Sequence, residues 1–543
     1  MAVSYDPLTL AGVVQQWAGR KPDLEVLVVE GAGVRDDEVR TYARLWDNGR
    51  SLAAGLRKLG VRPGDMVGTL LANHAEFVDL MVAGALLGCA LVPIDPRTKG
   101  EKLVYMLSAA HCRGVIVADY AATGLLEVRE RVPEVQWVVG LPTDEARATT
   151  AHLQALGVRP YGEVAACDPG TSELPGSAPD SPMELIYTSG TTGDPKGIVL
   201  THRRYCETSR MTPAIFGFGP DDRLYSGLSL THANAQCITL GTSLVNAIPC
   251  VLSRRFSKSR LWDITRKYGC TNFTLLGGMT TAVYAEPPKP TDADNPVRSI
   301  ISAGMPAAIW DEFRRRFGVE LYEFYGAAEG GLTGNPPGVG PVGSIGRPIP
   351  SLVHRIVDEQ GNDVPRDARG KRVGEILFRH KDRSPLVVEY YGQPEASAKK
   401  CAGGWLHMGD VVREDADGWL YFLYRKGSGI RRNGEFIGTA FVEKTIAEVP
   451  EVDDVYVYGI PSANGVPGEK DVVAAVVPKD PDLGAFDVQR LFRICRERLE
   501  PGFVPSYVQL LHLIPKTVSE KPQDRFLIEA FSNDPRAVHT EAR

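Results

Sequence analysis

The feature that most restricts the fold of this chain is a repeated alternation of strand-like and helix-like segments between about residues 40 and 320. The apolar runs DMVGTLL (65–71) and ALVPI (90–94) flank AEFVDLMVAGALL (75–87), whose length is typical of a buried helix. The same alternation recurs in three later segments, YSGLSL (225–230), CITLGTSLV (237–245) and IPCVL (248–252). Such alternation predicts α/β layers built around largely parallel sheets.

The length of the chain predicts more than one domain. Its 543 residues exceed what a single hydrophobic core usually supports. Short strand-like segments follow a Gly/Pro-dense stretch at 335–351, and beyond about residue 425 the pattern becomes compact α+β. We therefore expect an α/β fold with a large region at 1–424, made of layered α/β subdomains and a small β-rich subdomain. A small α+β domain is expected at 425–543.

Composition and charge exclude several classes of protein. The formal net charge is −6 and no basic tract is present, so no footprint for nucleic acid is visible. The first residues lack the pattern of a signal peptide, and the longest apolar run, LMVAGALLGCALVPI (80–94), is too short to span a bilayer. The 9 cysteines form no C-x-x-C motif, which favours reduced thiols. A cytoplasmic enzyme fits these features best.

The stretch YTSGTTGDPKGIVLTH (187–202) combines glycines, hydroxyl side chains and one lysine between two strand-like runs. Converging main-chain N–H groups, hydroxyls and a positive charge suit a phosphate. The spacing does not match a Walker A loop, because proline stands where the second glycine is required and Lys196 is followed by Gly197. A flexible polar hairpin tip is the alternative interpretation.

The stretch resembles the phosphate-binding loop of the adenylate-forming superfamily, which includes acyl-CoA synthetases, luciferases and nonribosomal-peptide adenylation domains. The family pattern is roughly [YF]-T-S-G-[ST]-T-G-x-P-K-G, and Thr188 to Gly197 matches every specified position. The resemblance covers nearly the whole chain and is nearest to acyl-CoA ligases of the crotonobetaine/carnitine type. It implies a large AMP-binding region followed by a mobile lid.

The segment EFYGAAEGG (323–331) resembles the family's Y-G-x-[TS]-E motif. The resemblance implies that Glu329 holds Mg²⁺ and that Tyr325 packs on the adenine; without it, Glu329 would be typical of a solvated loop. Ala328 departs from the motif, since the family has a threonine there that contacts a phosphate. The remaining nucleotide-binding positions carried over from the family are Thr188, Ser189, Gly190, Thr191, Thr192, Gly193, Lys196, Ala303, Gly304, Glu323, Phe324, Gly326 and Ala328.

The segment WLHMGDVVREDADGWLYFLYR (405–425) resembles the family's ribose-binding motif. A carboxylate can accept both ribose hydroxyls and an arginine can bridge ribose and phosphate, roles that fall on Asp410 and Arg425. Met408 and Tyr424 replace the usual threonine and aspartate. Taken alone, Asp410 would be typical of a turn-capping aspartate.

The last part of the chain resembles the family's lid. Gly427 takes the hinge position, and Arg431 stands where the family has a basic residue that reaches the phosphates, although an exposed surface charge is nearly as good an interpretation. Gly434 and Glu435 belong to the loop implied to act in thioester formation. In IPKTVSEK (514–521), Lys521 takes the place of the adenylation lysine, with glutamate before it where the family has glycine.

The resemblance also indicates an acyl site. His232, in LSLTHANAQ (228–236), matches the gate of the acyl tunnel, with a core or surface histidine as the alternative. No acidic residue lies between Thr231 and Leu244, which argues against an α-amino acid substrate. The predicted acyl pocket consists of His232, Gly277, Gly278, Gly304, Ala327, Gly330 and Gly331.

Together these motifs predict an AMP-forming acid–CoA ligase that uses ATP, Mg²⁺ and coenzyme A. Its partners would be a small carboxylic acid and CoA, with no nucleic acid and no membrane span; a homodimer is left open. One alternative is a stand-alone adenylation enzyme that loads a separate carrier protein. Another is a catalytically disabled, nucleotide-binding regulator, motivated by Ala328, Gly427 and Glu520.

Overall fold

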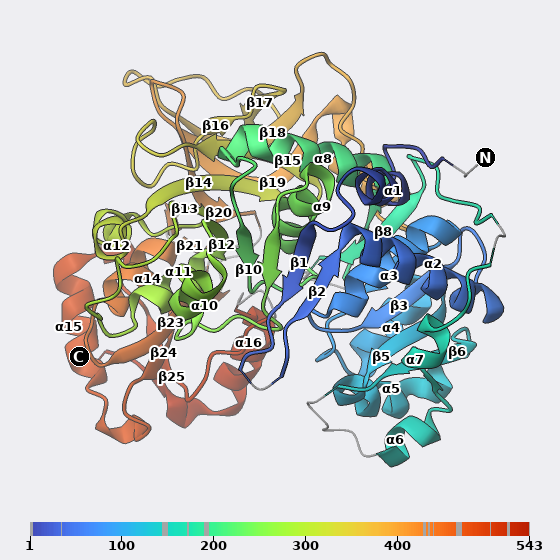
Figure 1. Ribbon diagram of the computed structural model, residues 1–543. Coiled ribbons are helices and arrows are strands. Elements are labelled where there is room, and N and C mark those ends of the chain that lie inside the picture. Colours follow the sequence, from blue (N-terminus) through green and yellow to red (C-terminus); the bar gives the residue numbers. More distant parts are fainter. Residues whose placement is uncertain are drawn as a thin grey trace. The chain divides into compact units, whose positions relative to one another are not determined.

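The computed structural model describes residues 4–33, 35–143, 150–170, 173–188, 195–426, 430–432, 435–437, 439–462, 470–499, 501–517 and 522–541 (Figure 1). The chain divides into two compact units. The first contains residues 1–352 and 379–406, and the second contains residues 353–378 and 407–543.

One sheet of the first unit carries the predicted phosphate loop. Its seven described strands lie in the order β7 (Arg159–Pro160), β6 (Trp137–Leu141), β5 (Cys112–Ala118), β3 (Met66–Leu70), β4 (Ala90–Pro93), β8 (Pro182–Tyr187) and β9 (Gly197–Thr201). Neighbouring strands are parallel except β8 and β9, which pair antiparallel. The two strands predicted to flank residues 188–196 are therefore confirmed.

A second sheet of the first unit carries the predicted acidic turn. Its nine described strands lie in the order β16 (Arg347–Pro348), β15 (Gly330–Asn335), β14 (Glu320–Ala327), β13 (Ser299–Ala303), β12 (Asn272–Leu276), β10 (Leu224–Ser226), β11 (Cys250–Leu252), β1 (Glu25–Val29) and β2 (Glu38–Thr41). The central strands are parallel, and the pairs at both edges are antiparallel.

Helices cover the two sheets and fill the space between them (Figure 1). The helices of this unit are α1 (Leu10–Arg20), α2 (Tyr42–Lys58), α3 (Ala75–Leu87), α4 (Gly100–Ala109), α5 (Ala122–Val128), α6 (Thr150–Ala155), α7 (Tyr161–Ala165), α8 (His202–Phe216), α9 (Thr242–Asn246), α10 (Leu261–Tyr268), α11 (Gly277–Tyr284), α12 (Trp310–Phe317) and α13 (Pro394–Lys400). Every residue of α3 except Glu76 is buried, because α3 contacts β4 and β8 of one sheet and β1 of the other.

The second unit contains three smaller sheets. Their described strands are β17 (Leu352–Val357), β18 (Arg372–His380), β19 (Leu406–Glu414) and β20 (Leu420–Arg425), then β21 (Ile430–Arg432) and β22 (Glu435–Ile437), then β23 (Val452–Pro461), β24 (Lys470–Pro478), β25 (Tyr507–Leu510) and β26 (Val538–His539). The helices are α14 (Thr439–Ala447), α15 (Val488–Arg498) and α16 (Asp524–Asn533). Val442, Ile446 and Phe492 of α14 and α15 pack on Val472 and Val476 of β24.

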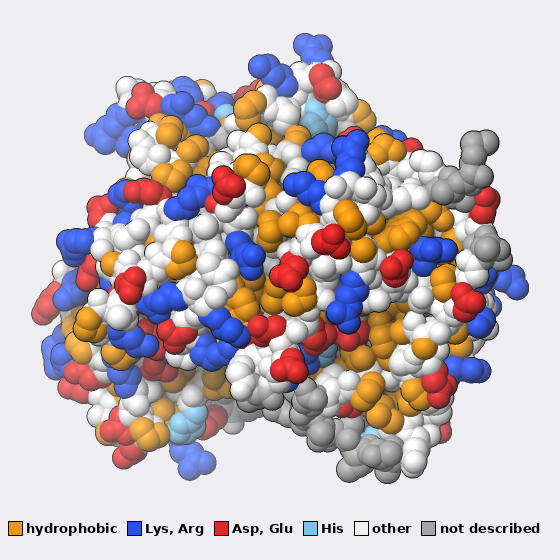
Figure 2. Space-filling model, in the orientation of Figure 1, with side chains coloured by type: hydrophobic (Ala, Val, Ile, Leu, Met, Phe, Trp, Pro, Cys, Tyr) orange, Lys and Arg blue, Asp and Glu red, His pale blue; other side chains and the backbone are white. Residues whose placement is uncertain are grey.

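The predicted fold class is confirmed in its layers of helices and parallel strands and in its smaller α+β part. The boundary after residue 424 stays a prediction, and the expected hinge at Gly427 lies outside the described residues. Among the helices that the structure describes, none combines the length and apolar character needed to cross a membrane. On the face drawn in Figure 2, basic and acidic side chains are interspersed.

Candidate active site

The predicted metal-binding glutamate lies on a tight turn at the end of β14. Strands β14 and β15 form an antiparallel hairpin in which Ala327 pairs with Gly330, so Ala328 and Glu329 form the connection. Gly330 has φ +127° and Gly331 has φ +71°, values that L side chains rarely adopt. These two glycines let the chain reverse directly after Glu329.

The carboxylate of Glu329 is surrounded by residues distant in sequence. Tyr390 Oη donates a hydrogen bond of 2.9 Å to Glu329 Oε1. Lys400 Nζ lies 3.9 Å from the same oxygen, and the Glu329 side chain is only 12% exposed. Lys196 Nζ lies 5.0 Å from the centre of the Tyr390 ring, in a cation–π contact. The acidic turn and the lysine of the phosphate loop therefore meet at Tyr390.

Backbone pairing explains how Tyr390 reaches this position. The segment around Tyr390 runs antiparallel beside β9, with a bridge between Ile198 and Tyr390. Tyr391 N donates to Gly197 O at 2.8 Å, next to Lys196 in the sequence. At the other end of the phosphate loop, Thr188 N donates to Lys196 O at 3.0 Å. Ser189, Gly190, Thr191, Thr192 and Gly193 lie outside the described residues.

Arg204 holds the acidic turn from a third element. Helix α8 begins directly after β9, where the Thr201 side chain caps it by accepting a hydrogen bond from Arg204 N. The Arg204 guanidinium donates to the carbonyl oxygen of Ala328. Burial lowers the pKa of Arg204, and Glu329 is among the nearby groups that oppose this shift. The first turn of α8, which follows β9 and the predicted phosphate loop, thus also holds the acidic turn through Arg204.

Glu323 shapes the neighbouring turn after β13. Its carboxylate accepts hydrogen bonds from Gly304 N at 2.6 Å and Met305 N at 3.1 Å. Burial raises the pKa of Glu323 to about 8, and these hydrogen bonds oppose the rise. Through these hydrogen bonds the Glu323 side chain fixes the backbone at Gly304 and Met305, which includes part of the predicted nucleotide-binding pair Ala303 and Gly304.

Successive β14 residues face opposite sides of the sheet. Phe324 is buried, with its ring 5.5 Å from that of Phe216 in an edge-on contact. The next two residues are more accessible than Phe324: Tyr325 is half-buried and Gly326 is exposed. The structure places Tyr325 three residues before Ala328 on the strand that ends in the acidic turn.

Several glycines of the predicted acyl pocket are needed by the backbone. A Cβ added to Gly277 would lie 2.8 Å from Gly304 O, too close for a real contact, and Gly304 itself has φ +96°. Gly330 and Gly331 also have positive φ. The structure brings Gly277 and Gly304 together. At these four glycines a side chain would either clash with the neighbouring backbone or strain a positive φ.

His232 lies in a turn that leads into a π-helix at Asn234–Gly241. Its backbone is fixed by His232 N donating to Ser229 O at 3.0 Å and by its carbonyl accepting from Gln236 N at 3.1 Å. Wide helical turns of this kind are frequent at functional sites. The predicted gate residue is therefore positioned by the start of an irregular helix.

A buried pair connects this π-helix to the strand before the phosphate loop. Gln236 Nε2 donates to Glu184 Oε1 on β8 at 3.2 Å and to Leu230 O at 2.7 Å. Both side chains are fully buried, and burial raises the pKa of Glu184 to about 8. Glu184 is therefore neutral in the folded protein at neutral pH.

Replacing Glu184 by glutamine is expected to remove part of the pH dependence of stability. The folded protein keeps the Glu184 proton up to pH about 8, whereas the unfolded chain loses it near 4.5. The wild-type free energy of unfolding therefore falls as pH rises through this window, by up to about 1.4 kcal/mol per pH unit. Urea denaturation at several pH values should show E184Q gaining stability relative to wild type as pH rises.

The matched control is Glu163→Gln, since Glu163 is exposed on α7. This variant should follow the wild-type pH profile. An E184Q profile parallel to that of wild type would contradict a neutral, buried Glu184.

The predicted ribose-binding pair lies in the second unit. Asp410 on β19 and Arg425 on β20 are direct cross-strand partners, with Arg425 Nε donating to Asp410 Oδ1 at 2.9 Å. The Asp410 side chain is 6% exposed and that of Arg425 is 45% exposed. Glu375 on β18 accepts from Gly409 N at 3.1 Å and from Lys426 Nζ at 2.6 Å, which fixes the backbone beside Asp410.

Several predicted lid residues fall outside the described part of the chain. Gly427, Gly434 and Lys521 are not among the described residues. The backbones of Arg431 and Glu435 lie on the antiparallel pair β21 and β22. Their assigned roles stay predictions.

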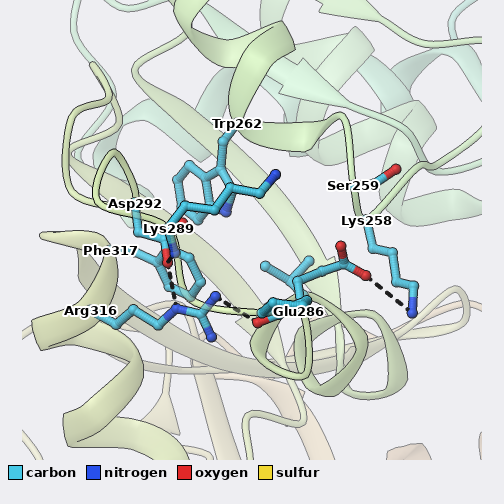
Figure 3. Close-up of a pocket in the computed structure, with 10 residues that line it drawn as sticks. Lys258, Ser259, Trp262, Glu286, Lys289, Asp292, Arg316 and Phe317 are labelled. Atoms are coloured by element: carbon cyan, nitrogen blue, oxygen red, sulfur yellow. Dashed lines mark hydrogen bonds and ion pairs between the residues drawn. The ribbon is translucent and has the colours of Figure 1, made fainter.

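A hollow on the first unit, lined by residues of α10, α11, α12 and adjoining loops, contains a network of charges (Figure 3). Arg316 Nε binds Asp292 Oδ2 at 2.7 Å, and Arg316 Nη2 donates to Glu286 O at 2.7 Å. Lys258 Nζ pairs with Glu286 Oε1 at 3.2 Å. The ten residues that line it include no predicted site residue, and Arg316 clamps the segment after α11.

Sequence reasoning did not identify four residues that the structure places at or beside the site, namely Glu184, Arg204, Tyr390 and Lys400. No local motif marks them, because each acts through a partner at least 50 residues away. The sequence offered one signal for these four residues. Glu184 is an ionisable residue inside the otherwise apolar strand-like run MELIY (183–187), but this signal concerns Glu184 alone.

Comparisons with known proteins match most of the chain. Residues 14–391 match the model of the family described as AMP-binding enzyme, and residues 442–521 match that of the AMP-binding enzyme C-terminal domain. A medium/long-chain-fatty-acid–CoA ligase of Mycobacterium marinum is 31% identical, covering 91% of this chain and 92% of the relative. A crotonobetaine/carnitine–CoA ligase of Salmonella typhi is 28% identical, covering 93% and 97%.

Solved structures show the same fold at lower identity. A crystal structure of an anthranilate CoA ligase with anthranoyl-AMP has a TM-score of 0.82 and 22% identity, covering 98% of both chains. An o-succinylbenzoate CoA synthetase of Bacillus subtilis, in complex with its acyl-adenylate, has a TM-score of 0.77 and 23% identity, covering 95% of this chain and 97% of the other.

Proposed function

The chain belongs to the AMP-binding enzyme family, and from this premise we propose that it is an ATP-dependent acid–CoA ligase that acts through an acyl-adenylate. The observation that carries the proposal is the convergence of Lys196, from the phosphate loop, and Glu329, from the acidic turn, on Tyr390. Relatives named as CoA ligases for fatty acids and for crotonobetaine/carnitine support the same reaction class.

In the first half-reaction a carboxylate oxygen of the acid attacks the α-phosphorus of ATP. The bond to the bridging oxygen breaks, and pyrophosphate leaves with the electron pair. Such chemistry depends on positioning and charge neutralisation. In this proposal the loop at 188–196 binds the β- and γ-phosphates, Asp410 and Arg425 bind the ribose, and Lys521 bridges the carboxylate and the α-phosphate.

Glu329 fits a magnesium ion that is shared with the nucleotide. Mg²⁺ prefers oxygen ligands and is commonly held by one or two carboxylates together with phosphates and water. Glu329 offers one carboxylate, whose side chain is 12% exposed, and among the described residues no group of three or more His, Cys, Asp or Glu side chains forms a separate metal site. The bound ion would neutralise negative charge on the phosphates.

In the second half-reaction the CoA thiol displaces AMP from the acyl-adenylate. The sulfur forms the thioester bond, and the AMP phosphate departs with the electron pair. We assign the change between the two steps to rotation of the lid about Gly427. This rotation removes Lys521 and brings the Gly434–Glu435 loop to the site, with Arg431 near the phosphates.

Two measurements separate this function from its alternatives. Exchange of labelled pyrophosphate into ATP, dependent on the acid, distinguishes an enzyme from a catalytically disabled nucleotide-binding regulator. A CoA thioester detected by mass spectrometry distinguishes a ligase from an enzyme that loads a carrier protein. Exchange without a thioester would support the carrier-loading alternative, and no exchange with any acid of a broad panel would overturn the proposal.

The acid is expected to be a bulky ring-bearing or branched apolar carboxylate. The predicted pocket residues are mostly Gly and Ala, and no acidic residue lies between Thr231 and Leu244 to bind an amine. Short acids would leave apolar surface unfilled and lose about 0.8 kcal/mol per CH₂ group not buried. Pyrophosphate release measured from acetate to a cyclic acid should show kcat/KM rising with size, and a preference for acetate or propionate would contradict it.

A matched variant tests which residue limits the size of the acid. Gly330→Leu is unsuitable, because its φ of +127° would strain any L side chain. Ala327 has no positive φ and precedes the acidic turn, so Ala327→Leu is the better change. This variant should raise KM for the largest acids about tenfold, because they would lose the burial of a few CH₂ groups. KM for small acids should stay unchanged.

A further inference from the structure

The segment between β10 and the π-helix carries His232, and much of it is buried although it has no regular secondary structure. Leu228 is 5% exposed and Leu230 is 1% exposed. A buried segment of this kind needs partners within the protein for its backbone N–H and C=O groups, because water does not reach them. Three of these groups are bound by side chains from distant parts of the first unit or from the helix that follows.

Asn73, which follows β3, holds the segment from one side. Asn73 is fully buried, and its Nδ2 donates to Leu228 O and to Ser253 O, each at 2.8 Å. Its Oδ1 accepts a hydrogen bond from Leu230 N at 2.8 Å. Both amide hydrogens and the amide oxygen are therefore engaged. They tie the end of β3, in one sheet, to the segment that leaves β10, in the other.

Gln236 holds the same segment from the other side. Its Nε2 donates to Leu230 O at 2.7 Å, so buried amide side chains bind both the N–H and the C=O of Leu230. Its backbone N donates to His232 O at 3.1 Å. Gln236 therefore contacts the chain on both sides of Thr231. The same turn also directs the His232 ring, since Nδ1 of that ring accepts from Asn234 N at 3.4 Å.

Glu184, on β8, directs the amide of Gln236. Its Oε1 accepts a hydrogen bond from Gln236 Nε2 at 3.2 Å. The remaining oxygens of the pair, Glu184 Oε2 and Gln236 Oε1, are buried and have no hydrogen-bond partner among the described residues. Burying polar atoms in this way costs free energy that an apolar pair of similar volume would not cost. What the polar pair adds is direction, because its hydrogen bonds specify one arrangement of the backbone.

We propose that Asn73 and Gln236 are positioning residues for recognition of the acid: by holding Leu230 from both sides, they set the place of His232, the predicted gate of the acyl tunnel. Glu184 supports this role by keeping the Gln236 amide directed. The inference rests on the proposed function and deepens it. The two amides act through His232 and not by touching the acid.

The test measures acid-dependent pyrophosphate exchange in the full-length protein. The acid is the member of the acetate-to-cyclic series that has the highest kcat/KM with wild type. Gln236→Met keeps the approximate volume of the side chain and removes both hydrogen-bond donors. Because Leu230 O loses its donor, KM for the acid should rise about tenfold, while kcat and KM for ATP should stay within about twofold of wild type.

A double-mutant cycle with His232→Ala separates positioning from a general effect on the fold. If Gln236 acts through His232, adding Q236M to H232A should change KM for the acid by less than about twofold. Asn73→Ser, whose side chain is too short to reach Leu230, should give the same rise in KM and the same lack of additivity. It tests the clamp from its other side if Q236M folds poorly.

A rescue variant and a control complete the set. In E184Q/Q236E the amide at position 184 can donate to the carboxyl at position 236, whose own proton can go to Leu230 O, so KM for the acid should return to within about threefold of wild type. Gln154→Met, at an exposed position on α6, should keep all wild-type constants. Far-UV circular dichroism and thermal midpoints show that each variant is folded at the assay temperature.

The outcomes separate the inference from its premise. An unchanged KM for the acid in Q236M, an equal rise in KM for ATP, or effects of Q236M and H232A that add would each overturn the inference. A wild-type KM for the acid in H232A would overturn it as well, since the clamp would then have no gate to position. A wild-type protein that exchanges no pyrophosphate with any acid would overturn the proposed function itself.

Discussion

Replacing Glu329 by glutamine is expected to lower acid-dependent pyrophosphate exchange by about 10²–10³-fold, the usual cost of removing one electrostatic stabiliser from an active site. Glutamine has the same shape, and its amide oxygen can still accept the hydrogen bond from Tyr390 Oη. The variant therefore keeps the turn and loses the negative charge that would bind Mg²⁺. The exchange rate at saturating ATP, measured over a range of Mg²⁺ concentrations, reports the change.

The control is Glu395→Gln, an exposed carboxylate in the first turn of α13. It should retain wild-type exchange and wild-type Mg²⁺ dependence. If E329Q exchanged pyrophosphate at the wild-type rate, the acidic turn would have no part in nucleotide chemistry, and the central observation behind the proposed function would lose its meaning.

Replacing Lys521 by alanine is expected to reduce adenylate formation by about 10²–10³-fold, because positive charge at the developing pentavalent phosphorus is lost. The residue lies outside the described part of the chain, so this prediction rests on the terminal motif IPKTVSEK (514–521). Thioester formation from a preformed acyl-adenylate should be unaffected, since Lys521 is assigned to the first half-reaction only. Measuring the two half-reactions separately gives the answer.

Lys479→Ala provides the comparison in the same unit, because Lys479 is exposed at the end of β24 and donates to Pro450 O. It should leave both half-reactions intact. Equal losses of both half-reactions in K521A would show that the lysine serves the fold or the lid as a whole, and its assignment to adenylation would be wrong.

Secondary structure was predictable wherever the pattern was long and locally consistent. AEFVDLMVAGALL (75–87), whose length is typical of a buried helix, is α3 residue for residue. The strands flanking the phosphate loop were also predictable, since MELIY and GIVLTH are short apolar runs bounded by turn residues. YSGLSL (225–230) was less accurate: β10 spans Leu224–Ser226, so only the first two residues of this run lie in a strand.

Part of the candidate site was predictable for a different reason. Lys196 and Glu329 belong to motifs whose residues are close in sequence, so their spacing carries the resemblance without any knowledge of the fold. For the glycines of the predicted acyl pocket, the sequence indicated only part of the reason for their presence. Their small size is visible in the sequence, whereas the positive φ of Gly304, Gly330 and Gly331 and the close approach of Gly277 to Gly304 are properties of the folded backbone.

By itself the sequence determined the α/β class, the family resemblance and the chemistry of residues clustered in motifs, because periodicity and spacing are local properties of the chain. Only the tertiary structure decided that Tyr390 and Lys400 reach Glu329, that Arg204 holds the carbonyl of Ala328, and that Glu184 is buried against Gln236. These contacts join strands and helices 52 to 124 residues apart. Long-range pairing of β9 with the segment around Tyr390 brings the Tyr390 ring to Glu329, and no local pattern encodes which distant segments will pair.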